Sequence, residues 1–121
     1  MAKEITPMFD LVEEKTLSDG CRFQRWDGVG YELIWRQYSP VGINIQVTPD
    51  KETSRFLPYI YVNTDDEGCP ICATIQTTSY GSLRIEEYME LQRAMAIAQA
   101  AAESIEAQFI NRKEEVSSDE Q

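Results

Sequence analysis

The chain has 121 residues, of which 21 are Asp or Glu and 11 are Lys or Arg, so its formal net charge is −10 at pH 7. It contains no histidine, the side chain most often used as a general base near neutral pH and as a neutral metal ligand. These properties favour a binding protein over an enzyme, and they disfavour direct contact with nucleic acid or with an anionic membrane.

The negative charge is spread over the whole chain. Segments 1–15, 16–82, 83–110 and 111–121 each carry an excess of two or three acidic residues. A uniformly negative surface steers a protein towards basic clefts, at rates that fall as salt rises. The simpler alternative is that the charge only keeps the protein soluble.

The sequence predicts a cytoplasmic protein, in the host cell cytoplasm if the gene belongs to a phage. The first 15 residues are too acidic and polar for a secretory signal, and no stretch reaches the ~18 to 20 apolar residues of a membrane span. Three cysteines, an odd number, suit a reducing compartment better than a disulfide framework.

The N-terminal segment from Glu4 to Lys15 predicts a short helix. Ile5, Met8 and Phe9 follow helical spacing together with Val12, and a proline at position 7 suits the first turn.

After Gly20 the apolar pattern changes to a period of two residues, which is typical of strands. Turn signals lie at 27–28, 40–42, 49–50 and 64–68, so we expect an antiparallel meander of five strands. The strands are expected around Cys21 and Phe23, around Tyr31, Leu33 and Trp35, around Ile43, Ile45 and Val47, and over residues 58–63 and 71–80.

A long helix is predicted from Ser82, where the apolar spacing changes to alternating steps of three and four residues. The members of this stripe are Tyr88, Leu91, Met95, Ala98, Ala102, Ile105 and Phe109. Its small central side chains suit close packing against a sheet, whereas three heptads of such spacing would also suit a homodimer seam.

Together these elements predict one α+β domain over residues 1–110, followed by a disordered acidic tail over 111–121.

One helix covers only one face of a meander, and the strands are rich in aromatic residues. We therefore expect an exposed aromatic face that either docks a partner or completes the core. The rings concerned are Trp26, Trp35, Tyr38, Tyr59, Tyr61 and Tyr80.

The sharpest local motif is Cys69-Pro70-Ile71-Cys72, because two thiolates at this spacing can reach one zinc ion. Cys21, which follows another turn, is the third available sulfur. A carboxylate of Asp19, Asp65, Asp66 or Glu67, or a water molecule, would complete the four ligands. A structural zinc site at Cys21, Cys69 and Cys72 is therefore one hypothesis, and three unrelated thiols are the alternative.

A thioredoxin-like redox motif is disfavoured. That chemistry needs the first cysteine at the N-terminus of a helix, whereas strand-forming residues follow Cys72.

Two acidic groups are candidate partner-binding residues. Asp65, Asp66 and Glu67 form an expected hairpin tip. Glu86, Glu87 and Glu90 lie at the start of the long helix, where the helix dipole also favours negative charge. The sequence has no phosphate-binding glycine loop, no nucleophile elbow and no basic aromatic stripe.

A short, acidic, histidine-free chain without enzyme motifs resembles the small phage-encoded anti-CRISPR proteins. The resemblance is one of overall character and involves no matched motif, so it transfers no site residues. It implies inhibition of an RNA-guided nuclease, by blocking DNA loading or by locking a recognition lobe, with a basic nucleic-acid-binding cleft as the partner surface. Two alternatives remain: an immunity protein, antitoxin or phage accessory protein that acts through assembly, and a small metal-binding or redox protein that uses the cysteines.

Overall fold

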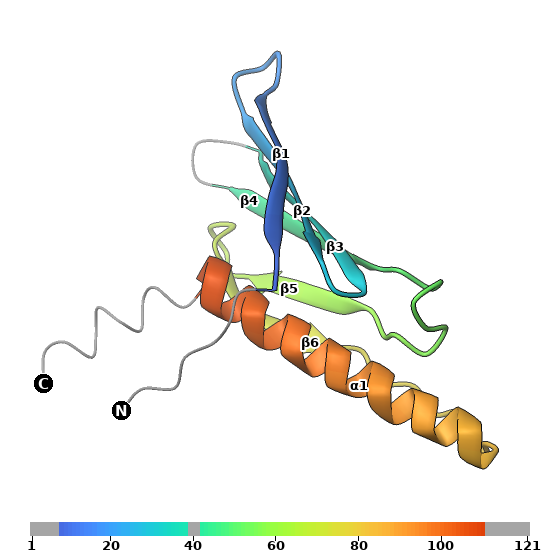
Figure 1. Ribbon diagram of the computed structural model, residues 1–121. Coiled ribbons are helices and arrows are strands. Elements are labelled where there is room, and N and C mark those ends of the chain that lie inside the picture. Colours follow the sequence, from blue (N-terminus) through green and yellow to red (C-terminus); the bar gives the residue numbers. More distant parts are fainter. Residues whose placement is uncertain (1–7, 39–41, 111–121) are drawn as a thin grey trace, which may run out of the picture.

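A computed structural model describes residues 8–38 and 42–110. Six antiparallel strands follow one another as neighbours in a single sheet, and one long helix packs against the sheet (Figure 1). The elements are β1 (Asp10–Thr16), β2 (Arg22–Gly28), β3 (Tyr31–Gln37), β4 (Ile43–Pro49), β5 (Ile60–Thr64), β6 (Pro70–Ile75), α1 (Ile85–Ile105) and the π-helical turn η1 (Glu106–Ile110).

The predicted α+β class and the antiparallel meander are confirmed, with six strands in place of five. β1 to β4 form long ladders, whereas β4 and β5 are paired only at Gln46 and Tyr61. The β5–β6 hairpin therefore lies across the end of the first four strands, and α1 runs along it (Figure 1).

The predicted N-terminal helix is wrong for the described residues, because residues 10–16 form the edge strand β1. Glu14 and Lys15 pair with Gln24 and Phe23 of β2, and the register shifts between Leu11 and Glu13. This bulge interrupts the alternation of apolar and polar side chains, so the segment lacks the period of two that marks a strand. Residues 4–7 of the predicted helix lie outside the described part of the chain.

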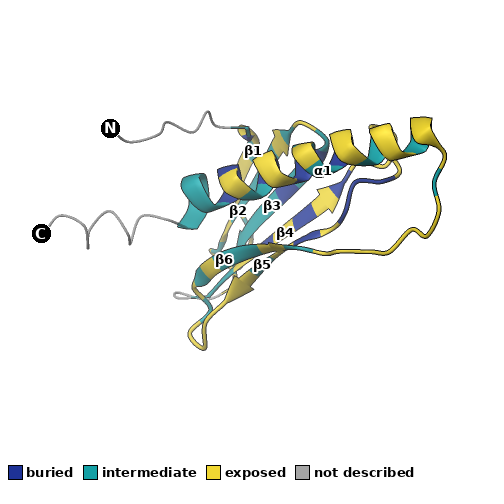
Figure 2. Ribbon diagram, turned by 90° about the horizontal axis from the view of Figure 1, so that it is seen from below, coloured by how far each residue is buried: buried dark blue, intermediate teal, exposed yellow. Residues whose placement is uncertain are grey.

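The start of helix α1 is capped by Glu87, whose carboxylate accepts the backbone N–H of Arg84 at 2.9 Å. Its buried face consists of Ala94, Ala98 and Ala101, which are at most 1% exposed, followed by Ser104 and Ile105. These small side chains let the helix axis approach the sheet closely, and the opposite face of the helix is exposed (Figure 2).

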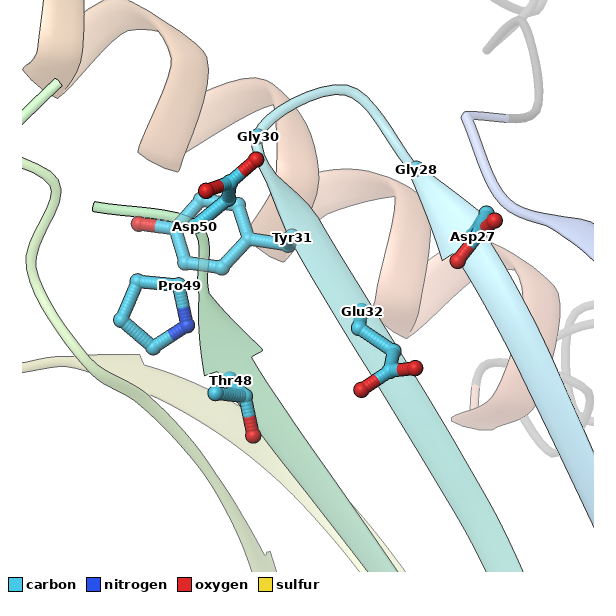
Figure 3. Close-up of a pocket in the computed structure, with 8 residues that line it drawn as sticks. All are labelled: Asp27, Gly28, Gly30, Tyr31, Glu32, Thr48, Pro49 and Asp50. Atoms are coloured by element: carbon cyan, nitrogen blue, oxygen red, sulfur yellow. The ribbon is translucent and has the colours of Figure 1, made fainter. Parts of the chain in front are cut away.

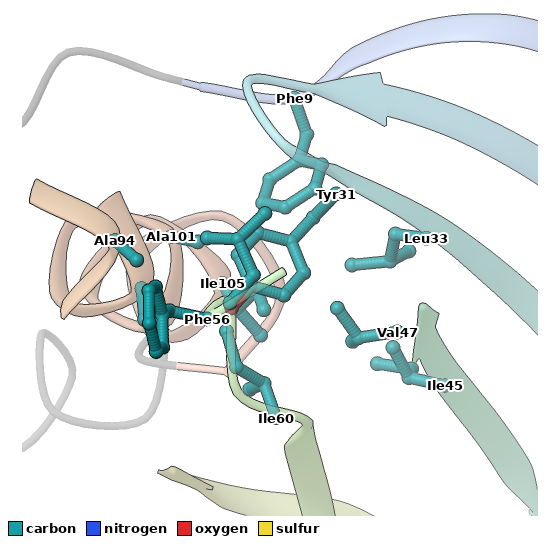
Figure 4. Packing of buried hydrophobic residues seen from close by; sticks show 12 residues of the cluster. Phe9, Tyr31, Leu33, Ile45, Val47, Phe56, Ile60, Ala94, Ala101 and Ile105 are labelled. Atoms are coloured by element: carbon teal, nitrogen blue, oxygen red, sulfur yellow. The ribbon is translucent and has the colours of Figure 1, made fainter. Parts of the chain in front are cut away.

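The core lies between α1 and the concave face of the sheet (Figure 4). Leu33 and Val47 come from the strands, while Phe56 and Leu57 come from the connection between β4 and β5. Phe9 enters from the segment before β1 and is 1% exposed.

The segment before β1 is tied to the end of the helix. The backbone N–H of Met8 donates to Ser104 Oγ at 2.9 Å, and the N–H of Phe9 donates to Gln108 Oε1 at 3.2 Å. The Gln108 amide in turn donates to the Phe9 carbonyl at 3.2 Å. These bonds fix the Phe9 ring over the core.

Within residues 8–38 and 42–110, neither α1 nor η1 has the length and apolar character that crossing a bilayer requires. The predicted disordered tail, 111–121, lies outside the described residues.

Candidate protein-binding groove

A hollow of about 640 Å³ opens where the helix ends over the sheet, beside the β5–β6 turn. We call it the tryptophan groove. Its lining comes from β2, β3, β4 and β6, from the β5–β6 turn and from η1, and comprises Gln24, Trp26, Trp35, Ile43, Asp65, Glu67, Cys69, Pro70, Gln108, Phe109 and Ile110.

The aromatic walls of the tryptophan groove follow from the strand register. Trp26 lies opposite Leu33, and Trp35 lies opposite Ile45, so both indoles point to the same face of the sheet as the core residues. Phe109 of η1 meets Trp26 edge-on, with ring centroids 5.1 Å apart. Both tryptophans remain half-buried, so their rings form a recessed wall of the groove.

A polar network on β1 and β2 orients these indoles. Trp26 Nε1 donates to Gln24 Oε1 at 3.1 Å, and Gln24 Nε2 donates to Glu14 Oε2 at 2.9 Å. Arg22 also donates to Glu14 Oε2, at 2.9 Å, and its guanidinium lies 5.4 Å from the centroid of the Trp35 ring. The Gln24 hydrogen bond and then the Arg22 bond hold the pKa of Glu14 below its usual value.

Carboxylates border the other side of the tryptophan groove. Asp65, Glu67 and Cys69 are exposed, and one potential ligand atom from each lies within 4.8 Å of the others. Asp65 Oδ1 accepts the backbone N–H groups of Glu67 and Cys69, each at 2.9 Å. The turn itself therefore brings these three side chains together, because one carboxylate organises the loop.

The structure does not bring the three predicted zinc-binding thiols together. Among the described residues, Cys69 forms a group of three potential ligands with Asp65 and Glu67, and no such group contains Cys21 or Cys72. Cys72 Sγ lies 3.6 Å from Asn63 Oδ1 across the β5–β6 ladder. Cys21 precedes β2, and strands β3 and β4 lie between β2 and the β5–β6 hairpin. The meander order thus separates turns that the sequence had suggested could meet at one edge.

The six predicted partner-binding carboxylates fall into two groups, at opposite ends of α1. Asp65 and Glu67 line the tryptophan groove, and Asp66 lies between them in the turn. At the other end, Glu87 pairs with Arg55 at 3.0 Å and caps the helix, and the Glu90 carboxylate accepts the Ser54 hydroxyl at 2.9 Å. Glu86 lies 3.5 Å from Arg84, with both side chains largely exposed.

The predicted single aromatic face is divided by the fold. Trp26 and Trp35 lie on the helix side of the sheet, whereas Tyr59 and Tyr61 are exposed and stacked 6.4 Å apart. Tyr80 packs edge-on against buried Phe56. The sixth ring, that of Tyr38, is 58% exposed and lies beside the Arg36 guanidinium.

A second, acidic hollow of about 390 Å³ lies at the β2–β3 turn, with Asp27, Glu32 and Asp50 around it (Figure 3). Sequence reasoning missed this group. Asp27 and Glu32 face each other across the ladder because they are equidistant from the turn at Val29-Gly30. Arg25 lies 3.9 Å from Asp27 and 3.4 Å from Glu32, so one cation serves both carboxylates. Centring the hairpin on Val29-Gly30 would have revealed the pair.

Alkylation of Cys21 by iodoacetamide should require higher pH in the folded chain than in the urea-unfolded chain. Burial, followed by the neighbouring Asp19 carboxylate, raises the pKa of the Cys21 thiol, so less of the reactive thiolate is present at a given pH. Mass spectrometry of Cys21 labelling over pH 7 to 10 measures the two midpoints. Asp19→Asn should lower the folded midpoint, and identical midpoints in both states would contradict the placement of Cys21.

Comparison of the chain with protein-family models, with curated proteins and with solved structures gives no match.

Proposed function

We propose that this protein is a non-enzymatic acidic inhibitor that binds the basic, nucleic-acid-binding surface of another protein. The specific case proposed is an anti-CRISPR inhibitor that blocks DNA loading of an RNA-guided nuclease. The observation that supports this proposal best is the tryptophan groove, in which recessed aromatic rings and exposed carboxylates line one hollow.

Aromatic residues in a recessed site are typical anchors of protein interfaces, because they bury a large area with few rotatable bonds. Carboxylates near such an anchor complement Arg and Lys side chains on the partner. The acidic hollow adds a second group of carboxylates, and the net charge of −10 provides long-range attraction. A basic cleft that normally holds phosphates presents the matching charges.

The direct test is displacement of DNA from a panel of purified, guide-loaded CRISPR nucleases, followed by fluorescence anisotropy of a labelled target duplex. We expect the protein to compete with the duplex for at least one nuclease, because carboxylates and phosphates would occupy the same basic side chains. Loss of DNA cleavage without loss of DNA binding would reject the DNA-loading mechanism. Absence of binding to every nuclease would reject the CRISPR assignment.

A further inference from the structure

We propose that the tryptophan groove receives an arginine side chain of the partner protein. This inference rests on the proposed function, because it names the group on the basic partner that the groove recognises.

The walls of the groove match a flat cation. A guanidinium group is planar and stacks on aromatic rings, with a preference for tryptophan. Trp26, Trp35 and Phe109 all line the groove, and the edge-on contact between Trp26 and Phe109 leaves differently oriented aromatic surfaces there. Lysine, a compact and strongly hydrated ammonium, gains less from such walls.

The charges around the groove are complementary to this ligand. The Glu67 carboxylate provides acceptors for the guanidinium N–H groups, and the Asp65 carboxylate, whose Oδ1 accepts two backbone N–H groups of the turn, adds negative charge beside it. Neither the last turn of α1 nor η1 carries a basic side chain, so the described helix does not itself neutralise the partial negative charge of its final carbonyls.

The protein already contains one contact of the proposed kind at the border of the groove. The Arg22 guanidinium lies 5.4 Å from the Trp35 ring centroid while it donates to Glu14. An aromatic ring that combines with a carboxylate to hold a guanidinium therefore occurs within this fold, and the groove repeats the combination with Trp26, Phe109 and Glu67.

Intrinsic fluorescence reports on this site alone, because the chain has two tryptophans and both line the groove. The probes are the peptide acetyl-Gly-Arg-Gly-Gly-amide and its citrulline counterpart, which keeps the shape of the side chain and removes its charge. We expect a saturable change in tryptophan emission with the arginine peptide and at least about fivefold weaker binding of the citrulline peptide.

Two matched substitutions separate recognition from general attraction. Glu67→Gln should weaken arginine-peptide binding about two- to fivefold, as expected for a solvent-accessible ion pair, and Asp65→Asn with Glu67→Gln about tenfold. Asparagine keeps the Oδ1 acceptor that organises the turn. Asp66→Asn makes the same charge change beside the groove, outside its lining, and should alter binding less than about 1.5-fold.

Two results would overturn the inference. These are equal binding of the arginine and citrulline peptides, and equal losses of binding for Glu67→Gln and Asp66→Asn.

The outcomes also distinguish this inference from the proposed function. Selective arginine binding without displacement of DNA from any nuclease supports the groove and rejects the inhibitor. Displacement of DNA that is unchanged by Asp65→Asn with Glu67→Gln supports the inhibitor and rejects the groove.

Discussion

Replacing Phe9 with alanine is expected to lower the free energy of unfolding by about 3 to 5 kcal/mol, as deletion of a fully buried aromatic side chain does. Phe9 is 1% exposed, and it joins the chain before β1 to the core beneath α1. The Ser104 and Gln108 hydrogen bonds hold its backbone in place, so the surrounding atoms collapse only partly into the cavity. Guanidinium unfolding followed by circular dichroism measures the loss.

Leu11→Ala is the matched control for this measurement. Leu11 lies two residues further along the same segment, but its side chain is 43% exposed. We expect a loss of less than about 1 kcal/mol. Equal losses for the two substitutions would contradict the placement of Phe9 in the core.

The contact between Phe9 and Gly28 gives a sharper form of the same test. A Cβ atom at position 28 would lie 2.7 Å from the Phe9 ring, so Gly28→Ala should cost about 1 to 3 kcal/mol in the unaltered chain. In the Phe9→Ala background the ring is absent, so the cost should be smaller, and the contact that remains is the 3.2 Å approach to the Met8 carbonyl oxygen. Strictly additive losses would show that the two residues do not touch.

Much of the fold could be predicted because local patterns and tertiary packing agree in most of the chain. The period of two in β3 and β4 places Leu33 and Val47 on the buried face, as observed, and the alanine-rich centre of α1 packs against the sheet. The sequence did not predict β1, because its bulge interrupts the alternation of apolar and polar residues that marks a strand. The segment forms a strand because it pairs with β2.

The candidate site was predictable only in parts. The sequence offered Trp26 and Trp35 as rings that either dock a partner or complete the core, and it offered Asp65 and Glu67 as partner-binding residues, without indicating that these four side chains line one hollow. Their meeting in one groove depends on how the β5–β6 hairpin crosses the end of the first four strands, since β4 and β5 pair only at Gln46 and Tyr61. No local periodicity encodes such a change of direction, because it arises from packing of the β5–β6 hairpin against α1.

The proposed inhibitor occupies a basic, nucleic-acid-binding surface through its distributed carboxylates. We therefore expect a large effect for a variant in which six carboxylates become amides, so that the net charge changes from −10 to −4. The six positions are Asp27, Glu32, Glu52, Asp66, Glu86 and Glu103. At about 0.5 kcal/mol for each charge, affinity for the target nuclease should fall about 100-fold at low ionic strength.

Two controls accompany this variant. Thermal unfolding should show that the variant still folds, because relief of like-charge repulsion offsets the loss of the exposed ion pairs of Asp27 and Glu32 with Arg25 and of Glu86 with Arg84. Raising the NaCl concentration to 0.5 M should reduce the difference in affinity between the two proteins, because salt screens exposed charges.

The most direct measurement is therefore the dissociation constant of the six-amide variant and of the unaltered chain for the same nuclease at low and high salt. We expect a roughly 100-fold difference at low salt that shrinks at high salt. Affinities that agree within about twofold at low salt would contradict binding through distributed carboxylates.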